Sequence, residues 1–409
     1  MNFTKSQCPY CGVGCGLKMK PKSSVSDDKW LVSGDRDSPS TQGKLCVKGA
    51  TVCETLKDGR LKEPLYRKNL NEEFKEISWD ESYEILKENI LSSIKNYGPD
   101  SIAMYGSGQF HTEDYYVAQK LLKGAIGTNN FDANSRLCMS SAVAGYNRSF
   151  GSDGPPCCYE DIDHCSLILL IGTNTAECHP VLFDRIKKRK RNVNDNLKVI
   201  VIDPRETETS SIADFYLQIS SGTDLFLFIG IANYLYMNQL TDQHFIEKST
   251  ENYFHFVKHI QKWDLKKISE ICNISEKTII DIAKLWGESK NVLSLWSMGL
   301  NQRQEGTAAV NGLINLHLMT GQIGKEGSGP FSLTGQPNAM GGREAGGLSH
   351  LLPGYRFVKN KIDRNEIEKI WGFPEGNISA KQGLSAFEQI EAIKKGSVKI
   401  WWIAATNPL

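Results

Sequence analysis

Cys8-Pro-Tyr-Cys-Gly-Val-Gly-Cys15, followed later by Gly43-Lys-Leu-Cys-Val-Lys-Gly49, is the part of the sequence that decides how the chain folds. The first three cysteines are separated by two and three residues, which brings their sulfur atoms close together in one tight loop. With the distant Cys46 they form the ligand set typical of a cubane iron–sulfur cluster. Gly12 and Gly14 allow the backbone to turn its N–H groups toward anionic sulfur. The pattern predicts a [4Fe–4S] domain at the N-terminus.

Two other chemistries use cysteines in similar patterns. A structural zinc site also takes four cysteines, but it more often combines two separated C-x2-C pairs, and this sequence has a single such pair. A radical S-adenosylmethionine enzyme would place the three-residue spacing before the two-residue spacing. The order found here favours a [4Fe–4S] cluster, with zinc as the alternative. Lys48 is either a cation that stabilises the reduced cluster or an ordinary surface lysine.

The composition narrows the class of protein. The 409 residues include 48 Lys plus Arg against 47 Asp plus Glu, so the charge balance indicates neither a nucleic acid nor an anionic membrane as partner. Forty per cent of the residues are apolar, and no apolar run is long enough to span a bilayer. The N-terminus shows no basic-plus-apolar export signal, and eleven cysteines fit a reducing compartment. We therefore expect a soluble, cytoplasmic redox protein.

Beyond the cluster segment, strands and helices alternate. Residues 101–108 read as a buried strand that runs into a glycine turn, with a helix expected near 114–126. A fully apolar strand at 166–174 precedes a helix at about 179–191 and a strand at 197–205 that contains Asp203. This order is that of a mononucleotide-binding βαβ unit, although a strict G-x-G-x-x-G is absent. A nucleotide site and a plain α/β sheet remain equally open from these residues alone.

The same alternation continues to residue 404, with strands expected near 215–219, 292–302 and 398–404, and helices near 79–94, 223–238, 243–248, 275–288, 306–319 and 384–395. It predicts parallel sheets covered on both faces. Residues 321–352 interrupt it and read as a long, glycine-rich loop, which in a compact domain is usually functional or disordered. Glycine there permits close backbone approach to a ligand, and Arg343 would supply a fixed cation for an anion.

Taken together, these segments resemble the molybdopterin oxidoreductases, and within them the assimilatory nitrate reductase catalytic subunits. The resemblance runs nearly end to end. It is carried by the cluster cysteines with Cys46-Val-Lys-Gly49, Asn134-Ser-Arg-Leu-Cys-Met-Ser-Ser-Ala-Val143, Pro155-Pro-Cys-Cys-Tyr-Glu-Asp161, the residues Gly172–Pro180, Asp203-Pro-Arg205, Met298–Gln302, and Gly335–Gly347 followed by Leu351–Gly354.

The resemblance implies an α/β fold of the formate dehydrogenase and DMSO reductase type. Residues 1–60 would form the [4Fe–4S] domain. Residues 61–145 together with 325–409 would form one α/β domain, and 146–324 a second α/β domain like those that bind dinucleotides. Family members continue into a β-rich domain that caps the cofactor, and these 409 residues would lack it.

The resemblance also implies a molybdenum ion held by two molybdopterin guanine dinucleotides and by the thiolate of Cys138, a soft ligand suited to such a metal. Read alone, Cys138 would more often be a buried structural cysteine. Cys8, Cys11, Cys15 and Cys46 would hold the cluster. The residues implied to contact the pterins and nucleotides are Lys48, Gln109, Asn134, Gly172, Thr173, Asn174, Glu177, Asp203, Arg205, Thr207, Gly222, Thr223, Asp224, Met298, Gln302 and Asn407.

Met139 separates the two activities that the resemblance allows. Formate dehydrogenases of this family place a histidine directly after the metal-bound residue, and Met139 cannot accept a proton. We therefore expect reduction of nitrate to nitrite in nitrate assimilation, with Met139 shaping the pocket and Arg343 attracting the anion. A formate dehydrogenase or a related enzyme of the same fold is the alternative, and a cofactor-less electron-transfer subunit is a third. Ferredoxin, flavodoxin or an NAD(P)H-linked flavoprotein would all serve as electron donor.

Overall fold

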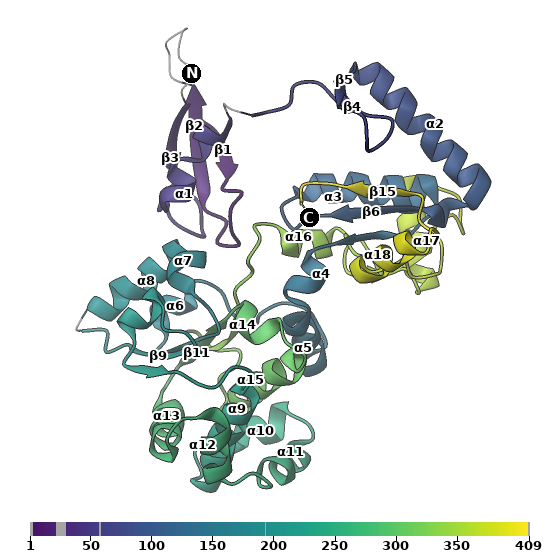
Figure 1. The fold of residues 1–409 in the computed structure, drawn as a ribbon. Coiled ribbons are helices and arrows are strands. Elements are labelled where there is room, and N and C mark those ends of the chain that lie inside the picture. The colour runs from purple at the N-terminus through teal and green to yellow at the C-terminus, as the bar shows by residue number, and fades with distance from the viewer. Residues whose placement is uncertain (1–2, 22–29, 57–58, 193, 408–409) are drawn as a thin grey trace.

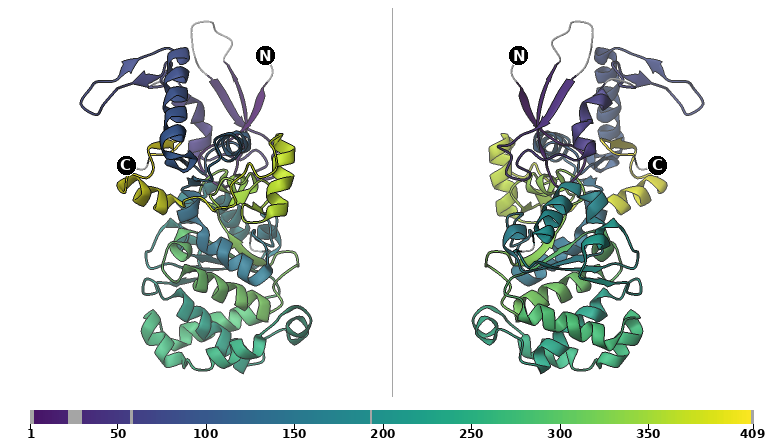
Figure 2. Two further views of the ribbon diagram at one scale, coloured as in Figure 1. Left: turned by 90° about the vertical axis from the view of Figure 1, so that its right-hand side faces the viewer. Right: turned by 90° about the vertical axis from the view of Figure 1, so that its left-hand side faces the viewer.

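The cluster segment folds as a small antiparallel sheet in this computed structural model, which describes residues 3–21, 30–56, 59–192 and 194–407. Strand β1 (Thr4–Gln7) pairs with β2 (Gly16–Pro21), and β2 pairs with β3 (Trp30–Gly34). Gln7 pairs with Gly16, so the residues between them form the loop of a hairpin. This sheet lies at one end of the molecule, with the helical layer α9–α13 at the opposite end (Figures 1 and 2).

The largest sheet is five-stranded and parallel, in the order β10-β9-β8-β11-β12. Its strands are β8 (Leu167–Ile171), β9 (Lys198–Ile202), β10 (Phe215–Leu217), β11 (Val292–Trp296) and β12 (Gly329–Ser332). Both central strands β8 and β11 are buried along their whole length, which explains their unbroken apolar sequence. The strand order reverses between β8 and β11, because β8 continues to β9 while β11 continues to β12.

Helices cover both faces of this sheet, as the sequence predicted. One face packs against α5 (Ser140–Phe150), α9 (Asp224–Met237) and α15 (Gly306–Met319). The other face packs against α8 (Pro180–Arg191), and buried residues of the cluster hairpin join the same apolar cluster. Cys8, Val13 and Cys15 share one apolar cluster with Leu182 and Leu333. The cluster domain is therefore part of the core and not a separate appendage.

A second parallel sheet joins distant parts of the chain. Strand β6 (Ile102–Gly106) lies between β7 (Phe131–Ala133) and β15 (Ile400–Ile403). Residues near 400 therefore complete a sheet that begins near 102. The predicted domain boundaries do not coincide with the sheets of the structure. Strand β12 pairs with β11, so residues 329–332 lie in the large sheet and not with the domain predicted at 325–409. Helix α5 likewise packs on α15, on the side of the large sheet.

The glycine-rich residues 321–352 are not one irregular loop. They contain β12, helix α16 (Ala339–Glu344) and the strand β13 (Leu351–Leu352), which pairs with β14 (Arg356–Phe357). The remaining elements are β4 (Leu65–Tyr66), β5 (Lys75–Glu76), α1 (Val47–Ala50), η1 (Val52–Leu56), α2 (Trp79–Tyr97), η2 (Pro99–Ser101), α3 (Thr112–Gln119), η3 (Lys120–Ile126), α4 (Ser135–Cys138), α6 (Asp161–His164), α7 (Thr175–Cys178), η4 (Glu208–Ile212), α10 (Gln243–Ser249), α11 (Tyr253–Ile260), α12 (Leu265–Cys272), α13 (Glu276–Glu288), α14 (Met298–Asn301), α17 (Lys361–Trp371) and α18 (Ala386–Lys394).

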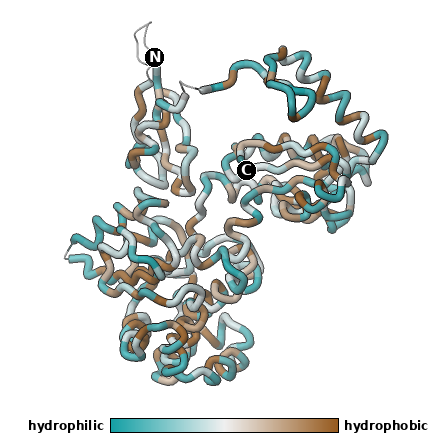
Figure 3. Tube along the Cα trace, viewed as in Figure 1, coloured by the Kyte–Doolittle hydropathy of each residue, from teal (hydrophilic) through white to brown (hydrophobic). Residues whose placement is uncertain are grey.

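Helix α2 begins as predicted, because the Ser78 side chain accepts a hydrogen bond from the Glu81 N–H. Only part of its apolar stripe is covered. Ile90 and Ile94 pack against the second sheet, whereas the side chains of Tyr83 and Leu86 are 59% and 49% exposed. Figure 3 shows hydrophobic positions recurring along this helix at the edge of the molecule. Among the described helices, none is long and apolar enough to cross a membrane.

Lys123 is a fully buried cation that fastens the glycine-rich segment to the π-helical turn η3. Its Nζ donates hydrogen bonds to the carbonyls of Gly346, Leu348 and Leu351, at 3.2, 2.8 and 2.5 Å. Three acceptors match the three donors of an ammonium group. Burial nevertheless lowers the pKa of Lys123 to about 7. The positions of α16 and β13 therefore depend on one side chain that lies more than 220 residues away in the sequence.

This burial predicts a pH dependence of stability. The unfolded chain holds the Lys123 proton up to about pH 10.5, whereas the folded chain releases it near pH 7. The stability that the folded protein gains by holding Lys123 in its neutral form is therefore fully present above pH 10.5. It is lost as the pH falls toward 7, and the free energy of unfolding then decreases by at most about 1.4 kcal/mol per pH unit. Between pH 7 and 10, the unfolding free energy of the wild-type protein should rise more steeply than that of Lys123→Met. Parallel curves in denaturant titrations would contradict this account.

Candidate functional site

The cluster cysteines lie in the β1–β2 hairpin loop and at the start of α1. The N–H of Cys8 donates to the carbonyl of Cys15 at 2.9 Å, and the N–H of Gly14 donates to that of Cys11 at 3.2 Å. These two bonds close the loop so that its three thiols share one region. Gly14 has a φ of 65°, a left-handed conformation that favours glycine. Cys46 precedes the first residue of α1 and brings the fourth thiol.

The four thiols are close enough to influence one another electrostatically. Burial raises the pKa values of Cys8, Cys11 and Cys15, that of Cys15 to about 12, and each neighbouring thiolate raises them further. Lys48 lowers the pKa of Cys8 and Cys11. Grouped, buried thiols of this kind become thiolates only next to a strongly positive group, so the donor set fits an iron–sulfur cluster. Among the described residues, no three His, Cys, Asp or Glu stand close enough for a single metal ion.

A backbone junction joins the cluster loop to the glycine-rich segment. The N–H of Gly12 donates to the carbonyl of Gly335 at 3.0 Å, and the Tyr159 hydroxyl donates to the Gly12 carbonyl at 3.1 Å. A methyl group on Gly12 would lie 1.9 Å from the carbonyl oxygen of Thr334. The same oxygen is 2.9 Å from Nε2 of His179. The two segments therefore meet so closely that only glycine fits at position 12.

Cys138 lies on the other side of this junction, at the end of α4. The N–H of Gly335 hydrogen bonds to its sulfur, and the Met298 sulfur lies 3.4 Å from it. Burial raises the pKa of the Cys138 thiol, while Arg343 and the Gly335 N–H lower it. Gly335 thus contacts the cluster loop through its carbonyl and Cys138 through its N–H. A single peptide segment connects the predicted cluster site with the predicted molybdenum ligand.

Arg343, predicted to be a fixed cation for an anion, pairs with a carboxylate of the chain itself. Its Nε lies 2.9 Å from Oδ2 of Asp153, and both side chains are about nine-tenths buried, at 11% and 10% exposed. The contact is an ion pair that lacks hydrogen-bond alignment at Nε. Burial raises the pKa of Asp153 despite the neighbouring guanidinium. Both residues line a cavity of about 630 Å³ with Arg136 and His350.

Met139 and Gln302 hold the segment around Cys138 in place. The Met139 side chain is 5% exposed, and its sulfur accepts a hydrogen bond from the Asn301 amide at 3.1 Å. The Gln302 amide donates to the carbonyl of Leu137 at 3.3 Å. Both contacts tie α4 to the turn that follows β11. Met139 is thus part of the wall around Cys138 and offers no group that accepts a proton at neutral pH.

The predicted nucleotide-binding residues follow the carboxyl ends of β8, β9 and β11. Gly172 and Met298 lie where the strand order reverses, the position at which open α/β sheets bind ligands. The N–H of Gly299 donates to the Gly172 carbonyl at 3.0 Å, so these two strand-end turns touch. Thr173 is buried. Asn174 donates to Glu177 at 2.8 Å and accepts from Thr209 at 3.1 Å, which joins this turn to the one after β9.

The turns after β9 and β10 are also ordered by their own side chains. Asp203 accepts from the Arg205 N–H at 2.9 Å, and Thr207 caps η4 by accepting from the Thr209 N–H at 3.3 Å. Thr223 donates to the Ser220 carbonyl at 2.7 Å. The carboxylate of Asp224 and the carbonyl of Gly222 both pair with the guanidinium of Arg303. Arg303, which was not among the predicted site residues, neutralises the carboxylate of Asp224, which was.

Three further predicted residues lie near the cluster loop or the second sheet. The Gln109 amide donates to the Pro9 carbonyl at 3.2 Å, and the Asn134 side chain accepts from the Gly108 N–H at 3.0 Å. Lys48 is exposed, and it lowers the pKa of His179 as well as those of two cluster thiols. Asn407 follows the end of β15 and lies apart from these contacts in sequence. Most of the predicted residues therefore follow the carboxyl ends of strands in the two parallel sheets.

Comparison with protein families identifies this arrangement. Residues 1–58 match the Fe4S4 domain of the molybdopterin oxidoreductases, and residues 60–409 match the molybdopterin oxidoreductase domain. The chain belongs to the molybdopterin oxidoreductase family. The prediction of a [4Fe–4S] domain, of a molybdopterin cofactor and of parallel α/β sheets is thereby confirmed. The match favours a [4Fe–4S] cluster over zinc, the alternative left open by the cysteine spacing.

Several curated relatives of this molybdopterin oxidoreductase are similar over the whole chain. A nitrate reductase from Synechocystis sp. is 52% identical over 99% of the chain, a periplasmic nitrate reductase from Desulfovibrio desulfuricans 42% over 99%, and a nitrate reductase from Klebsiella oxytoca 40% over 100%. The chain spans 57%, 55% and 45% of these proteins. It therefore corresponds to about half the length of the relatives it matches.

A solved structure with the same fold is the acetylene hydratase from Pelobacter acetylenicus. It superposes on 99% of the chain and 57% of its own with a TM-score of 0.77, at 19% sequence identity. At this identity the likeness shows the fold alone. The α/β architecture expected from the sequence is thus shared with this solved structure.

The Arg343–Asp153 pair predicts how anion binding responds to charge and pH. Removing the carboxylate in Asp153→Asn should strengthen binding of a small monovalent anion beside Arg343 about tenfold, roughly 1.4 kcal/mol, because Arg343 would no longer be neutralised. In the wild-type protein, anion binding should strengthen as the pH falls, since the raised pKa of Asp153 lets it take a proton at a higher pH than an ordinary carboxyl group does. Nitrate-dependent protection against thermal unfolding measures both effects. A pH response that persists in Asp153→Asn would rule this explanation out.

Proposed function

We propose that this protein reduces nitrate to nitrite by oxygen-atom transfer. The observation that carries the proposal is the 52% identity, across nearly the whole chain, to a protein named nitrate reductase. The reaction takes nitrate, two electrons and two protons to nitrite and water. When bound, the molybdopterin cofactor would supply a metal able to accept an oxygen atom, and a [4Fe–4S] cluster would supply the electrons.

The side chains around Cys138 favour an oxyanion over formate. Oxidation of formate needs a base next to the metal ligand, and the position after Cys138 holds the buried thioether of Met139. Reduction of an oxyanion needs an enclosed, positively charged place for it. Arg343 supplies the positive charge, and Asp153 holds the guanidinium in position and partly neutralises that charge. The cavity of about 630 Å³ beside these residues is large enough to admit nitrate with its water.

The backbone junction gives each nearby residue a role in orienting the site. The Gly335 N–H fixes the sulfur of Cys138 and stabilises its anionic form. His179 holds the carbonyl of Thr334, and Gly12 holds that of Gly335, so the cluster loop and the segment beside Cys138 keep a fixed separation. Because electron transfer slows steeply with distance, such a junction would keep the transfer distance between the two centres constant.

We further propose the bis(molybdopterin guanine dinucleotide) form of the cofactor, bound along the carboxyl ends of the parallel strands. The strand-end turns at Gly172–Glu177, Asp203–Thr207 and Gly222–Asp224 present backbone N–H groups and carboxylates suited to phosphate, ribose and guanine. Lys48, Gln109, Asn134, Met298, Gln302 and Asn407 would complete the contacts to the pterins. The reversal of strand order between β8 and β11 supports this placement.

An assimilatory role in the cytoplasm, with a ferredoxin, a flavodoxin or an NAD(P)H-linked flavoprotein as donor, completes the proposal. Eleven free cysteines support a reducing compartment. One relative carries the name of a periplasmic enzyme, so the compartment needs its own test by fractionation.

A comparison of substrates tests the proposed reaction. The protein, purified anaerobically with its cofactors, is assayed for nitrite formation from nitrate with reduced viologen, and separately for viologen reduction by formate. We expect nitrite formation and no formate oxidation. Formate oxidation without nitrite formation would show that Met139 had been misinterpreted and would make the formate dehydrogenase alternative correct.

A further inference from the structure

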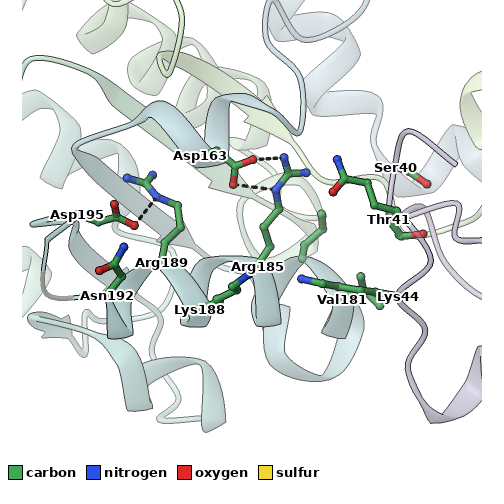
Figure 4. Close-up of a pocket in the computed structure, with 12 residues that line it drawn as sticks. Ser40, Thr41, Lys44, Asp163, Val181, Arg185, Lys188, Arg189, Asn192 and Asp195 are labelled. Atoms are coloured by element: carbon green, nitrogen blue, oxygen red, sulfur yellow. Dashed lines mark hydrogen bonds and ion pairs between the residues drawn. The ribbon is translucent and has the colours of Figure 1, made fainter. Parts of the chain in front are cut away.

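A second charged site lies where the cluster domain meets helix α8, away from Cys138. It is a pocket of about 240 Å³, shown in Figure 4. One wall is the loop that leads to Cys46, with Ser40, Thr41 and Lys44. The other wall is α8, whose Arg185 and Lys188 face the pocket with Asp163 beside them. Four cationic side chains and two carboxylates line it, so its net charge is positive.

The cations of this pocket fall into two groups. Arg185 is fixed by Asp163 at 3.0 Å, and Arg189 lies 3.5 Å from Asp195 (Figure 4). Lys44 and Lys188 are exposed, and no ion pair joins either of them to a carboxylate among the described residues. The arginines therefore form a rigid base, and the two lysines at the rim carry uncompensated charge. The chain as a whole has a net charge of only +1, so this positive region is local.

The pocket also adjoins the cluster. Lys44 precedes the ligand Cys46 by two residues, which places their Cα atoms at most about 7 Å apart. The Lys44 N–H donates to the Thr41 carbonyl at 3.0 Å, so the loop is closed by its own turn. Val47, directly after Cys46, is 74% exposed. A partner resting on this rim would therefore lie close to the edge of the cluster site.

We propose that the Lys44–Lys188 rim and its arginine base dock an acidic one-electron carrier protein. This inference rests on the proposed function, because a reductase of this kind must receive electrons one at a time at its cluster. In each encounter the carrier loses one electron and the cluster gains it, and no bond forms or breaks. Positive charge beside the entry point attracts an acidic carrier from solution and aligns its redox centre.

The test measures cluster reduction without nitrate. Reduced acidic [2Fe–2S] ferredoxin is mixed with the oxidised holoprotein, and cluster reduction is followed by stopped-flow absorbance over a series of sodium chloride concentrations. The variant is Lys44→Glu with Lys188→Glu. The matched control is Lys262→Glu with Lys266→Glu, which makes the same charge change at exposed positions at and beside α12, at the far end of the molecule. Reduced viologen, a small cation, serves as the second donor.

We expect the rim variant to slow reduction by ferredoxin at least about tenfold at low salt and to flatten its salt dependence. Reduction by viologen should not slow, and the control should behave as wild type. Equal rates in rim variant and control would overturn the proposal, as would equal losses with both donors. Stronger inhibition by inorganic phosphate than by sodium chloride at matched ionic strength would also overturn it, because the pocket would then hold a small anion. None of these measurements of cluster reduction contains nitrate, so a failure of the proposed nitrate reduction would appear separately, in the nitrite assay.

Discussion

Cys138→Ala is expected to lower nitrate reduction by at least about 10³-fold, roughly 4 kcal/mol of lost transition-state stabilisation. The reason is that the thiolate of Cys138, oriented by the Gly335 N–H, is the group proposed to bind molybdenum. Molybdenum content should fall with activity. Iron content should stay at the wild-type level, because the cluster cysteines lie in a separate loop that is closed by its own hydrogen bonds.

Cys157→Ala is the matched control for this experiment. Cys157 is also partly buried, and its sulfur contacts the carbonyl of Pro330, but it faces the large sheet and not the turn at Gly335. Its replacement should leave molybdenum and activity near wild type. If Cys157→Ala removed the metal and Cys138→Ala retained it, the assignment of the metal ligand would be wrong.

Gly12→Ala should separate the cluster loop from the site around Cys138. The added methyl group would lie 1.9 Å from the backbone oxygen of Thr334, and backbone cannot move aside as a flexible side chain can. Overpacking in well-packed regions costs about 1–3 kcal/mol, and this contact lies at the upper end. We expect a lower unfolding temperature, partial loss of iron, and nitrate reduction at least about 100-fold slower with viologen, roughly 2.7 kcal/mol.

Gly335→Ala provides the comparison at the other side of the same junction. A methyl group there meets only the Met298 methyl at 3.6 Å, an ordinary van der Waals contact, and both hydrogen bonds of the Gly335 backbone are retained. This variant should keep its iron and most of its activity. Equal damage from the two substitutions would mean that loss of glycine flexibility, and not the steric clash at Thr334, explains the result.

Much of the fold could be predicted because the hydrophobic pattern of each segment agrees with its burial in the folded protein. Strands β8 and β9 are buried on both faces, so their sequences are continuously apolar, and the helices between them have clear periodicity. Strand β12 could not be predicted in the same way, because Gly329 and Pro330 are poor strand formers and its pairing with β11 determines its conformation. The short helices α11 and α12 likewise depend on packing against α9.

The same distinction between local sequence pattern and contacts made by the fold applies to the candidate site. The cluster domain could be predicted because the spacing of Cys8, Cys11 and Cys15 is encoded locally. His179 and Asp153 were missed as site residues because each acquires its contact through the fold: His179 meets Thr334 across 155 residues, and Asp153 meets Arg343 only once α16 is in place. The role of Arg343 in attracting the anion therefore stays a prediction, and its ion pair with Asp153 was not predicted.

The metal content of the anaerobically purified protein is the sharpest test of the proposed cofactors. We expect about four iron atoms per chain and about one molybdenum atom, with a guanine nucleotide released on denaturation. Iron at this level without molybdenum, in protein that had access to the cofactor during expression, would contradict the account and would indicate a chain of this family that only transfers electrons.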